Sequence, residues 1–246
     1  MSDTMAHDPD QLPTDQLPTD NKIALRRIAR GCRKAGLATL LADGAPYASL
    51  VTVAFDLDLA PILLLSGLAD HTRNLLADGR ASLLLDGTDG HPNPQTGPRV
   101  TLTGRAARCD DDALRARFLV RHPAAALYAG FGDFAIWKLT PERAHFVGGF
   151  GRAVWFDAPF GLAPAATAAL RAAEAELLEQ ANRDHAVALA RLGPEWRVAA
   201  LDADGADLAN PEGFRRLSFR APVEDADSLR GALAETVRED FSLSFR

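Results

Sequence analysis

The spacing of hydrophobic residues changes along the chain and predicts different kinds of element in its two parts. In the first part, short apolar runs such as "LATLLA", "PYASLVTVAF" and "PILLLSG" are separated by the turn signals "DG" and "DLDLAP". The segment "RVTLTGRAARC" alternates strictly between apolar and polar residues, as a strand with one wet or ligand-facing side does. Short strands with few helices between them predict a β-barrel or sandwich rather than a parallel βαβ sheet.

Other segments repeat their apolar residues every three to four positions, as amphipathic helices do. They cover residues 21–35, 110–121 and 165–192, and a final segment that begins at about residue 225. A further short helix follows the strand-like "PILLLS" within the stretch "LSGLADHTRNLLADG". There, Asp70 is predicted to cap the start of the helix and Gly79 to stop it.

A change in composition at "FDAPFGLAP", residues 156–164, predicts a domain boundary. After it come a long alanine- and leucine-rich helix, the strand-like runs "WRVAALD" and "FRRLSFR", and the final helix. The sequence therefore predicts an α+β chain, with a barrel or sandwich domain at residues 21–158 and a small α+β domain at residues 165–246. Residues 1–20 are acidic, contain prolines and repeat the unit "DQLPT", which predicts a disordered tail.

Composition narrows the class of protein. With 246 residues, 47% of them hydrophobic, and a net charge of −6, the chain is typical of a soluble globular protein and is a poor general binder of nucleic acids. No apolar run is long enough to span a membrane and no secretory signal is present, so the expected location is the cytoplasm. Cys32 and Cys109 lie far apart without a CxxC motif, which favours neither a disulfide framework nor a structural zinc site.

The turn before the short helix is the first candidate for chemistry. The unpaired amides of a first helical turn welcome an anion, Thr72 adds a hydroxyl group, and Arg73 adds a guanidinium group that matches phosphate oxygens. The same polar residues also occur in ordinary capped surface helices. The residues alone thus leave two interpretations open, a phosphate site and a capped helix that faces water.

Three other stretches carry polar groups in patterns with simpler explanations. The polar face of "PRVTLTGRA" either lines a planar ligand or faces solvent, and the glycines of "HFVGGFGRA" favour a barrel corner over a nucleotide loop. In "NRDH", Asn182 and His185 share one face of a helix, where a structural histidine is more common than a metal ligand. Because no GxSxG, HExxH or Walker A motif occurs, an enzyme with this sequence would depend on a cofactor.

Taken in order, "PYASLVTVAFD", "LLLSGLADHTRNLLADGRASLLL", "PRVTLTGRAAR" and "HFVGGFGRAVWF" resemble the pyridoxamine 5′-phosphate oxidase-like FMN-binding split barrels. The resemblance is to the branch with a GGFGxA segment, which includes heme-utilisation proteins of the HugZ/HutZ type. The second part, with "NRDH", "AALDADGADL", "RRLSF" and "LRGAL", resembles the small domain of unknown function that follows the barrel in that branch. The resemblance covers about residues 21–241 and implies an N-terminal split β-barrel followed by a small α+β domain.

The resemblance also implies a homodimer through the barrel, with FMN at the subunit interface. The FMN phosphate would lie at the turn from Ser66 to Asn74, and the strand "YASLVT" would pass the flavin ring. Arg99 stands where the oxidases usually carry a Gln that contacts the flavin. The cofactor-binding residues implied in this way are Ser49, Val51, Thr52, Ser66, His71, Thr72, Arg73, Asn74 and Arg99.

Two departures separate this chain from the oxidases that process pyridoxamine phosphate. Where those carry an "SRK"-like basic cluster, this chain reads Ala69-Asp70-His71, and their C-terminal substrate-binding Arg and His pattern is missing. Some members of the heme branch bind heme in place of FMN through a histidine, for which the candidates are His145 and His185. Three functions follow: a flavin-dependent redox module of unknown substrate, a heme-binding or heme-degrading protein of iron utilisation, and a non-catalytic regulatory binding module.

Overall fold

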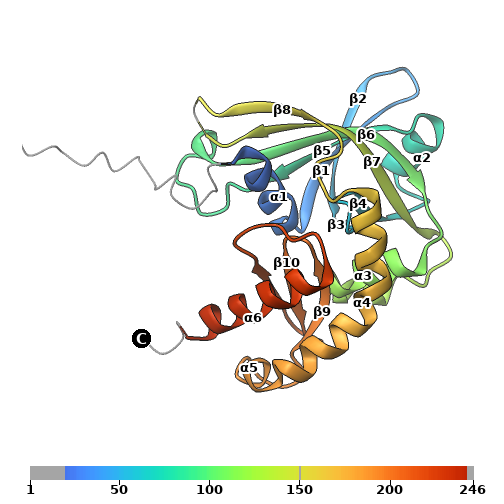
Figure 1. Cartoon of the computed structure of the whole chain (residues 1–246). Coiled ribbons are helices and arrows are strands. Elements are labelled where there is room, and N and C mark those ends of the chain that lie inside the picture. Colours follow the sequence, from blue (N-terminus) through green and yellow to red (C-terminus); the bar gives the residue numbers. More distant parts are fainter. Residues whose placement is uncertain (1–19, 150, 243–246) are drawn as a thin grey trace, which may run out of the picture.

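The computed structural model describes residues 20–149 and 151–242 (Figure 1). The predicted disordered tail lies outside this part of the chain except for Asp20, whose carboxylate accepts hydrogen bonds from the Lys22 and Ile23 amides at the start of the first helix. The elements, in chain order, are α1 (Asn21–Gly31), β1 (Lys34–Leu40), β2 (Pro46–Thr52), β3 (Ala54–Phe55), β4 (Pro61–Ser66), α2 (Asp70–Ala77), β5 (Arg80–Asp86), the 3-10 helix η2 (Pro94–Thr96), β6 (Arg99–Arg108), α3 (Asp112–Arg121), the 3-10 helix η3 (Pro123–Leu127), β7 (Phe134–Val147), β8 (Ala153–Asp157), α4 (Pro164–Asp184), α5 (Ala186–Ala190), β9 (Arg197–Asp202), β10 (Gly205–Ala209), β11 (Phe214–Ser218) and α6 (Ala226–Ser242).

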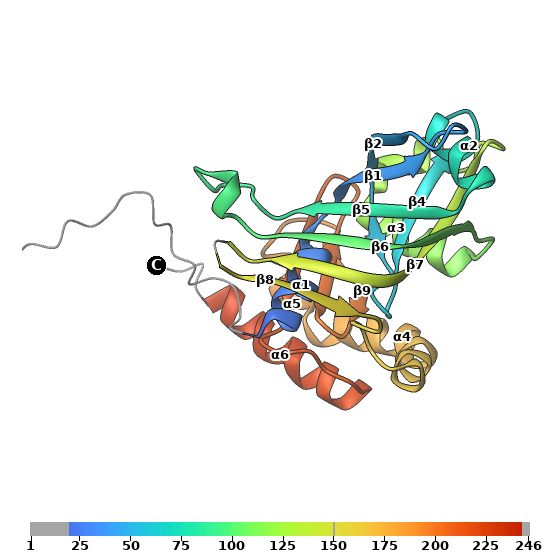
Figure 2. The same cartoon turned by 90° about the horizontal axis from the view of Figure 1, so that it is seen from above.

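Eight strands form one curled antiparallel sheet. The strand order is β2-β1-β5-β6-β7-β4-β3, and β8 also pairs with β7. Figure 2 shows the strands from β2 to β8 side by side when the sheet is viewed from above. The long strand β7 pairs with β6, β4 and β8, so it links the open part of the sheet to the part that curls around the core. This sheet, followed by a C-terminal α+β region, confirms the predicted α+β class with a split barrel.

Side-chain alternation determines which face of the sheet forms the core. In β6, Val100 and Leu102 are fully buried, whereas Thr101 between them is partly exposed. Strand β4 is buried on both faces because α3 covers the face that points away from the barrel core. Helix α3 lies within the predicted helix of residues 110–121, and its buried Leu114 and Phe118 pack against β4 in a separate apolar cluster.

Helix α1 packs into the barrel core through Ala24, Leu25 and Ala29, which are completely buried. The helix ends at Gly31, four residues before the predicted end. The reason is that residues 34–40 form strand β1, which pairs with β2 on one side and β5 on the other. Gly36, predicted to follow the helix, instead lies within that strand, opposite Leu50 of β2.

The C-terminal region builds a second core around the three-stranded sheet β11-β10-β9. Leu170 and Leu177 of α4 and Leu233 of α6 are buried in this core, and Leu57, from the turn after β3, joins them. The predicted helix over residues 165–192 is interrupted at His185, which separates α4 from α5. The segment between β8 and α4 contains the predicted domain boundary, and Figure 1 shows α4 and α6 on the same side of the small sheet.

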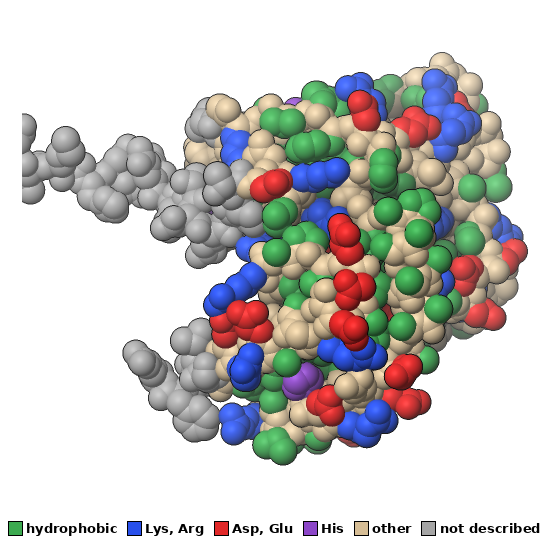
Figure 3. All heavy atoms as spheres, viewed as in Figure 1, with side chains coloured by type: hydrophobic (Ala, Val, Ile, Leu, Met, Phe, Trp, Pro, Cys, Tyr) green, Lys and Arg blue, Asp and Glu red, His purple; other side chains and the backbone are tan. Residues whose placement is uncertain are grey.

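The surface mixes charges of both signs. On the face shown in Figure 3, acidic and basic side chains are interspersed without a large area of either sign. Within residues 20–149 and 151–242, no helix combines the length and the apolar character that crossing a membrane requires. Cys32 is buried and Cys109 partly buried, and both thiols are free. Burial raises the pKa of Cys32 to about 11, so this thiol stays protonated near neutral pH.

Candidate functional site

The turn between β4 and α2 contains the predicted phosphate-binding residues. The N-cap of α2 is Ala69, which makes no side-chain capping bond, and Asp70 is the first residue of the helix. The prediction that Asp70 is the N-cap is therefore wrong by one position. Ser66 closes the turn, because its Oγ donates to Asp133 Oδ2 at 2.6 Å and accepts from the Leu68 amide at 3.1 Å. The hydroxyl group of Ser66, one of the implied cofactor-binding residues, is thus engaged within the protein.

The turn has a single cationic side chain, and that side chain is already paired. Arg73 is the only Lys or Arg from Ser66 to Asn74. It forms an ion pair with Asp70 and donates a hydrogen bond from Nη1 to the Leu68 carbonyl oxygen at 2.8 Å. Its side chain is 60% exposed. A phosphate group at this turn would compete with the Asp70 carboxylate, so the turn offers little net positive charge to a dianion.

His71 and Ser49, which come from two separate motifs, lie side by side. The Ser49 Oγ and His71 Nδ1 atoms are 3.1 Å apart, within hydrogen-bond distance. Burial lowers the pKa of His71, and the nearby charge of Asp70 offsets this effect only in part. The imidazole is therefore neutral at neutral pH. This pair connects strand β2 to the first turn of α2.

The next two predicted residues of α2 point into the protein. Thr72 is 3% exposed, and its Oγ1 is buried without a hydrogen-bond partner among the described residues. Asn74 is buried and donates a hydrogen bond to Thr39 Oγ1 at 3.0 Å. The Asn74 bond fixes α2 against β1. Neither side chain extends from the turn toward solvent.

The predicted strand residues face two different sides of the sheet. Val51 is buried in the barrel core, on the same face of β2 as Ser49, whereas Thr52 points to the opposite side and is exposed. Arg99 of β6 donates hydrogen bonds to the carbonyl oxygens of Gln95 and Gly97, at 3.4 and 3.2 Å. The structure therefore joins Ser49 to the turn and leaves Val51, Thr52 and Arg99 outside that group.

A second group of side chains lies on the face of the sheet that points away from the barrel core, which we call the outer sheet face. There, the His145 ring stacks on Trp155 with 4.6 Å between ring centroids, and Arg143 Cζ lies 4.5 Å from the Trp155 centroid. Leu50, Leu84 and Trp155 are 76%, 46% and 48% exposed. Strand register places one residue from each of six strands in a single row, namely Leu50, Gly36, Leu84, Thr101, His145 and Trp155.

His185, the other histidine singled out in the sequence, lies between α4 and α5 in the C-terminal region. Burial lowers its pKa, against the charge of Asp184. The hydrogen bonds of this segment are made by Asn182, whose side-chain amide bonds the backbone carbonyl and N–H of Val198, each at 2.9 Å. The structural role predicted for His185 therefore belongs to Asn182.

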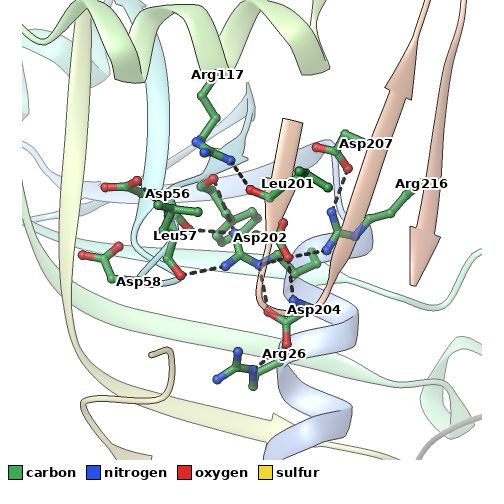
Figure 4. Close-up of polar contacts among 12 residues, drawn as sticks. Arg26, Asp56, Leu57, Asp58, Arg117, Leu201, Asp202, Asp204, Asp207 and Arg216 are labelled. Atoms are coloured by element: carbon green, nitrogen blue, oxygen red, sulfur yellow. Dashed lines mark hydrogen bonds and ion pairs between the residues drawn. The ribbon is translucent and has the colours of Figure 1, made fainter. Parts of the chain in front are cut away.

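The largest cluster of buried charges joins the barrel to the C-terminal region, and we did not predict it from the sequence. Arg30 is 1% exposed and contacts Asp202 and Asp204 as well as the backbone carbonyls of residues 55–57. Figure 4 shows Arg26 and Arg216 on two sides of these aspartates. The sequence feature that could have indicated this cluster is "LDADGADL", which places three aspartates in one hairpin. We call this cluster the interregion network: Arg26, Arg30, Arg121, Arg216, Asp202, Asp204 and Asp207.

These aspartates serve as partners of arginines rather than as ligands of a cation. Within the described part of the chain, no group of three or more His, Cys, Asp or Glu side chains is arranged to hold a metal ion. Burial opposes ionisation of Asp202, but the charges of Arg216 and Arg30 outweigh it and hold the pKa of Asp202 below its usual range. Asp202 therefore stays ionised near neutral pH.

Comparison with known proteins connects the fold to two kinds of relative. The family model for pyridoxamine 5′-phosphate oxidase matches residues 22–148. The non-canonical heme oxygenase HOZ of Arabidopsis thaliana chloroplasts is 39% identical over 114 residues, which cover 45% of this chain and 34% of that protein. The match thus spans about a third of the length of the plant protein.

Two solved structures extend the similarity to nearly the whole chain. The protein Atu2129 of Agrobacterium tumefaciens, of unknown function, is 29% identical with a TM-score of 0.70, and the match covers 93% of this chain and 100% of that one. A heme-binding protein of Mycobacterium smegmatis is 32% identical with a TM-score of 0.56, and the match covers 91% of this chain and 98% of that one. Both matches therefore include the C-terminal region as well as the barrel.

Proposed function

The chain belongs to the pyridoxamine 5′-phosphate oxidase family, and from this premise we propose that it is a heme-binding member of that family. The resemblance seen in the sequence to the split barrels and to their heme-utilisation branch is confirmed. The observation that carries the proposal is the similarity to the heme-binding protein of Mycobacterium smegmatis, because it extends over 91% of this chain. The Arabidopsis relative, which is named a heme oxygenase, supports it over the barrel.

The side chains of the turn fit heme better than they fit FMN. The FMN phosphate is a dianion, and the only cation of the turn, Arg73, is paired with Asp70. Heme binding instead uses an imidazole for the iron, apolar side chains against the flat faces of the porphyrin, and cations for the two propionates. His71 provides a neutral imidazole at the turn, and Leu68 beside it is 76% exposed. These residues would hold heme without a dedicated phosphate site.

Bound heme would supply an iron centre that binds dioxygen, and the chain would supply its environment. In this proposal, the turn would hold the heme iron through the imidazole of His71. The exposed Arg73 of the same turn could leave Asp70 for a propionate as readily as for a phosphate, and either exchange contributes little free energy. Heme would therefore be held mainly through the imidazole and apolar contacts, whereas FMN would depend on its phosphate. The reaction catalysed, if heme is consumed, would depend on how this environment exposes the iron to dioxygen.

We further propose that a second copy of this chain covers the outer sheet face. Leu50, Leu84 and Trp155 lie in one cross-strand row and are between 46% and 76% exposed, which is unusual for apolar side chains of a sheet. A two-fold interface pairs the same patch of both subunits, and a row of exposed side chains across six strands can meet its own copy in this way. The homodimer implied by the resemblance would use this face. The free cysteines fit a reducing compartment, and we place the protein in the cytoplasm.

The experiment that tests the function is a titration of the purified chain with hemin and, separately, with FMN, followed by visible absorption. We expect a sharpened and shifted Soret band with saturation at a fixed stoichiometry for hemin, and no retained flavin after FMN is added and the protein is desalted. Retention of FMN together with an unchanged hemin spectrum would overturn the proposal. Loss of the Soret band under air with a reductant would extend the function to heme breakdown.

A further inference from the structure

We propose that His71 Nε2 is the axial ligand of the heme iron and that Ser49 is the residue that positions it. The inference deepens the proposed heme-binding function and rests on it. It assigns a role to a side-chain contact between two of the predicted motifs, the 3.1 Å contact between Ser49 Oγ and His71 Nδ1. Neither residue was a heme-ligand candidate in the sequence, where the choice lay between His145 and His185.

The ring nitrogen of His71 that would not bind iron, Nδ1, contacts an oxygen atom of the protein. A histidine that binds a metal usually engages its other ring nitrogen with an oxygen atom, which fixes the tautomer and the orientation of the ring. His71 has this arrangement, because Nδ1 faces the Ser49 hydroxyl group. When that hydroxyl accepts the Nδ1 proton in a hydrogen bond, Nε2 keeps its lone pair. Ser49 is held by strand β2, so the ring orientation is set by the sheet.

The other ring nitrogen, Nε2, is open to a ligand. Among the described residues it has no hydrogen-bond partner, and it is not one of the buried side-chain atoms without a partner. The ring is half-buried, with Nδ1 turned toward β2 and Nε2 reaching the surface. An axial ligand needs this combination of a fixed ring and an accessible nitrogen.

Exposed apolar side chains lie on the turn and on the segment bonded to it. Leu68 lies in the same turn and is 76% exposed. The turn is joined to the segment before β7 by the hydrogen bond from the Gly67 amide to the Asp133 carbonyl oxygen, and in that segment Phe131 is 59% exposed. Two large apolar side chains are thus exposed on segments that are bonded to each other, and one of these segments is the turn that leads into His71. A porphyrin is a flat apolar ligand that buries such side chains.

The other four described histidines lack one of these features. The side chain of His91, in the loop after β5, has no hydrogen bond within the described part of the chain that would orient its ring. His122 is buried, and its Nε2 is taken by the Val53 carbonyl oxygen at 2.9 Å. The His145 ring is stacked against Trp155 but has no oxygen atom on a ring nitrogen to fix its tautomer. His185 belongs to the C-terminal region, away from the barrel sheet. His71 alone among them combines an oriented ring with an accessible nitrogen at the predicted cofactor turn.

The test compares His71→Ala, Ser49→Ala and His145→Ala in the full chain, with His185→Ala as a matched control in the C-terminal region. Ferric hemin complexes are followed by absorption, electron paramagnetic resonance and the iron–histidine band in resonance Raman spectra of the reduced form. Far-ultraviolet circular dichroism confirms that each variant is folded. We expect His71→Ala to lose the iron–histidine band and to bind hemin at least tenfold more weakly, and added imidazole to restore the histidine-type spectrum.

The remaining variants separate the roles of the residues. Ser49→Ala is expected to keep the hemin but to shift the iron–histidine band, because the ligand loses its hydrogen-bond partner. His71→Cys is expected to replace the histidine-type spectrum by a thiolate-type one. An unchanged spectrum in His71→Ala, or loss of the iron–histidine band in His145→Ala, would overturn the assignment. A wild-type chain that fails to bind hemin would instead overturn the proposed function, so the two failures are distinguishable.

Discussion

The interregion network and the turn at His71 use similar side chains in opposite ways. In the network, arginines and aspartates are between 2% and 9% exposed, and Arg30 engages all three of its guanidinium nitrogens. At the turn, the Arg73–Asp70 pair is about 60% exposed on both sides, and the Nε2 atom of His71 has no partner among the described residues. The first arrangement is closed to other molecules and the second is open to them.

This difference separates charges that hold the fold from charges that can change partners. Removing one member of a buried pair leaves the other buried without compensation, which costs several kcal/mol. Removing one member of an exposed pair costs little, because water takes its place. Arg30 and Arg73 test the two regions against each other, and Asp56, a buried carboxylate whose backbone carbonyl accepts from Arg30, tests the same contrast with acid.

The largest effect is expected for Arg30→Ala. The substitution leaves Asp202 and Asp204 buried with one partner fewer and removes one donor from each of three backbone carbonyls. We expect the free energy of unfolding, measured by urea titration, to fall by about 3–5 kcal/mol. Arg183→Ala, which removes an exposed ion pair with Glu179, is the control and should leave this free energy unchanged within error. Equal losses in both variants would show that the network does not hold the two regions together.

A smaller effect is expected from acid. Burial alone would raise the pKa of Asp56, but Lys138, the Leu57 amide and Arg171 outweigh it and lower this pKa to about 2. A carboxyl group with a lowered pKa stabilises the fold above its unfolded pKa of about 4, and this contribution is lost as the pH falls from about 4 to 2. It amounts to about 2 kcal/mol. Unfolding free energies measured across this range should fall less steeply in Asp56→Asn, and equal slopes would contradict the prediction.

The smallest effect is expected for Arg73→Ala. Because the Arg73–Asp70 pair is exposed, we expect the unfolding curve of this variant to overlay that of the wild type. Hemin binding should weaken by about fivefold, or about 1 kcal/mol, through loss of a cation for a propionate. Arg80→Ala removes another exposed pair, with Asp78, away from the turn and should leave the hemin affinity unchanged. A destabilised Arg73→Ala protein with normal hemin affinity would reverse the comparison between the two regions.

Much of the fold could be predicted because it depends on local patterns. The strict alternation in β6 and the apolar spacing of α3 are properties of ten neighbouring residues, and both appear in the structure as predicted. Boundaries were less predictable. Helix α1 ends at Gly31 because the following residues pair with the next strand, β2, and with the more distant β5. Helix propensity alone contains no information about that pairing.

The functional groups were harder to predict because they depend on distant contacts. Arg26 and Asp204 are 178 positions apart, and nothing in either segment reveals that they meet. At the turn, the sequence identified Arg73 correctly as a cation, but its neutralisation by Asp70 depends on a side-chain orientation within one helical turn. The pairing of Ser49 with His71 is a tertiary contact across 22 positions. The sequence therefore predicts which types of residue lie at the turn, but it does not predict which side chains they pair with.

The stack of His145, Trp155 and Arg143 gives the molecule a built-in optical reporter. Trp137 lies in the barrel core at 3% exposure and Trp196 packs against the C-terminal core, whereas the indole of Trp155 is half exposed and contacts an imidazole and a guanidinium group. Cationic neighbours quench indole emission, and a heme within the same particle absorbs it by energy transfer. Changes in tryptophan fluorescence would therefore report, without any added label, when another molecule arrives at this side of the sheet.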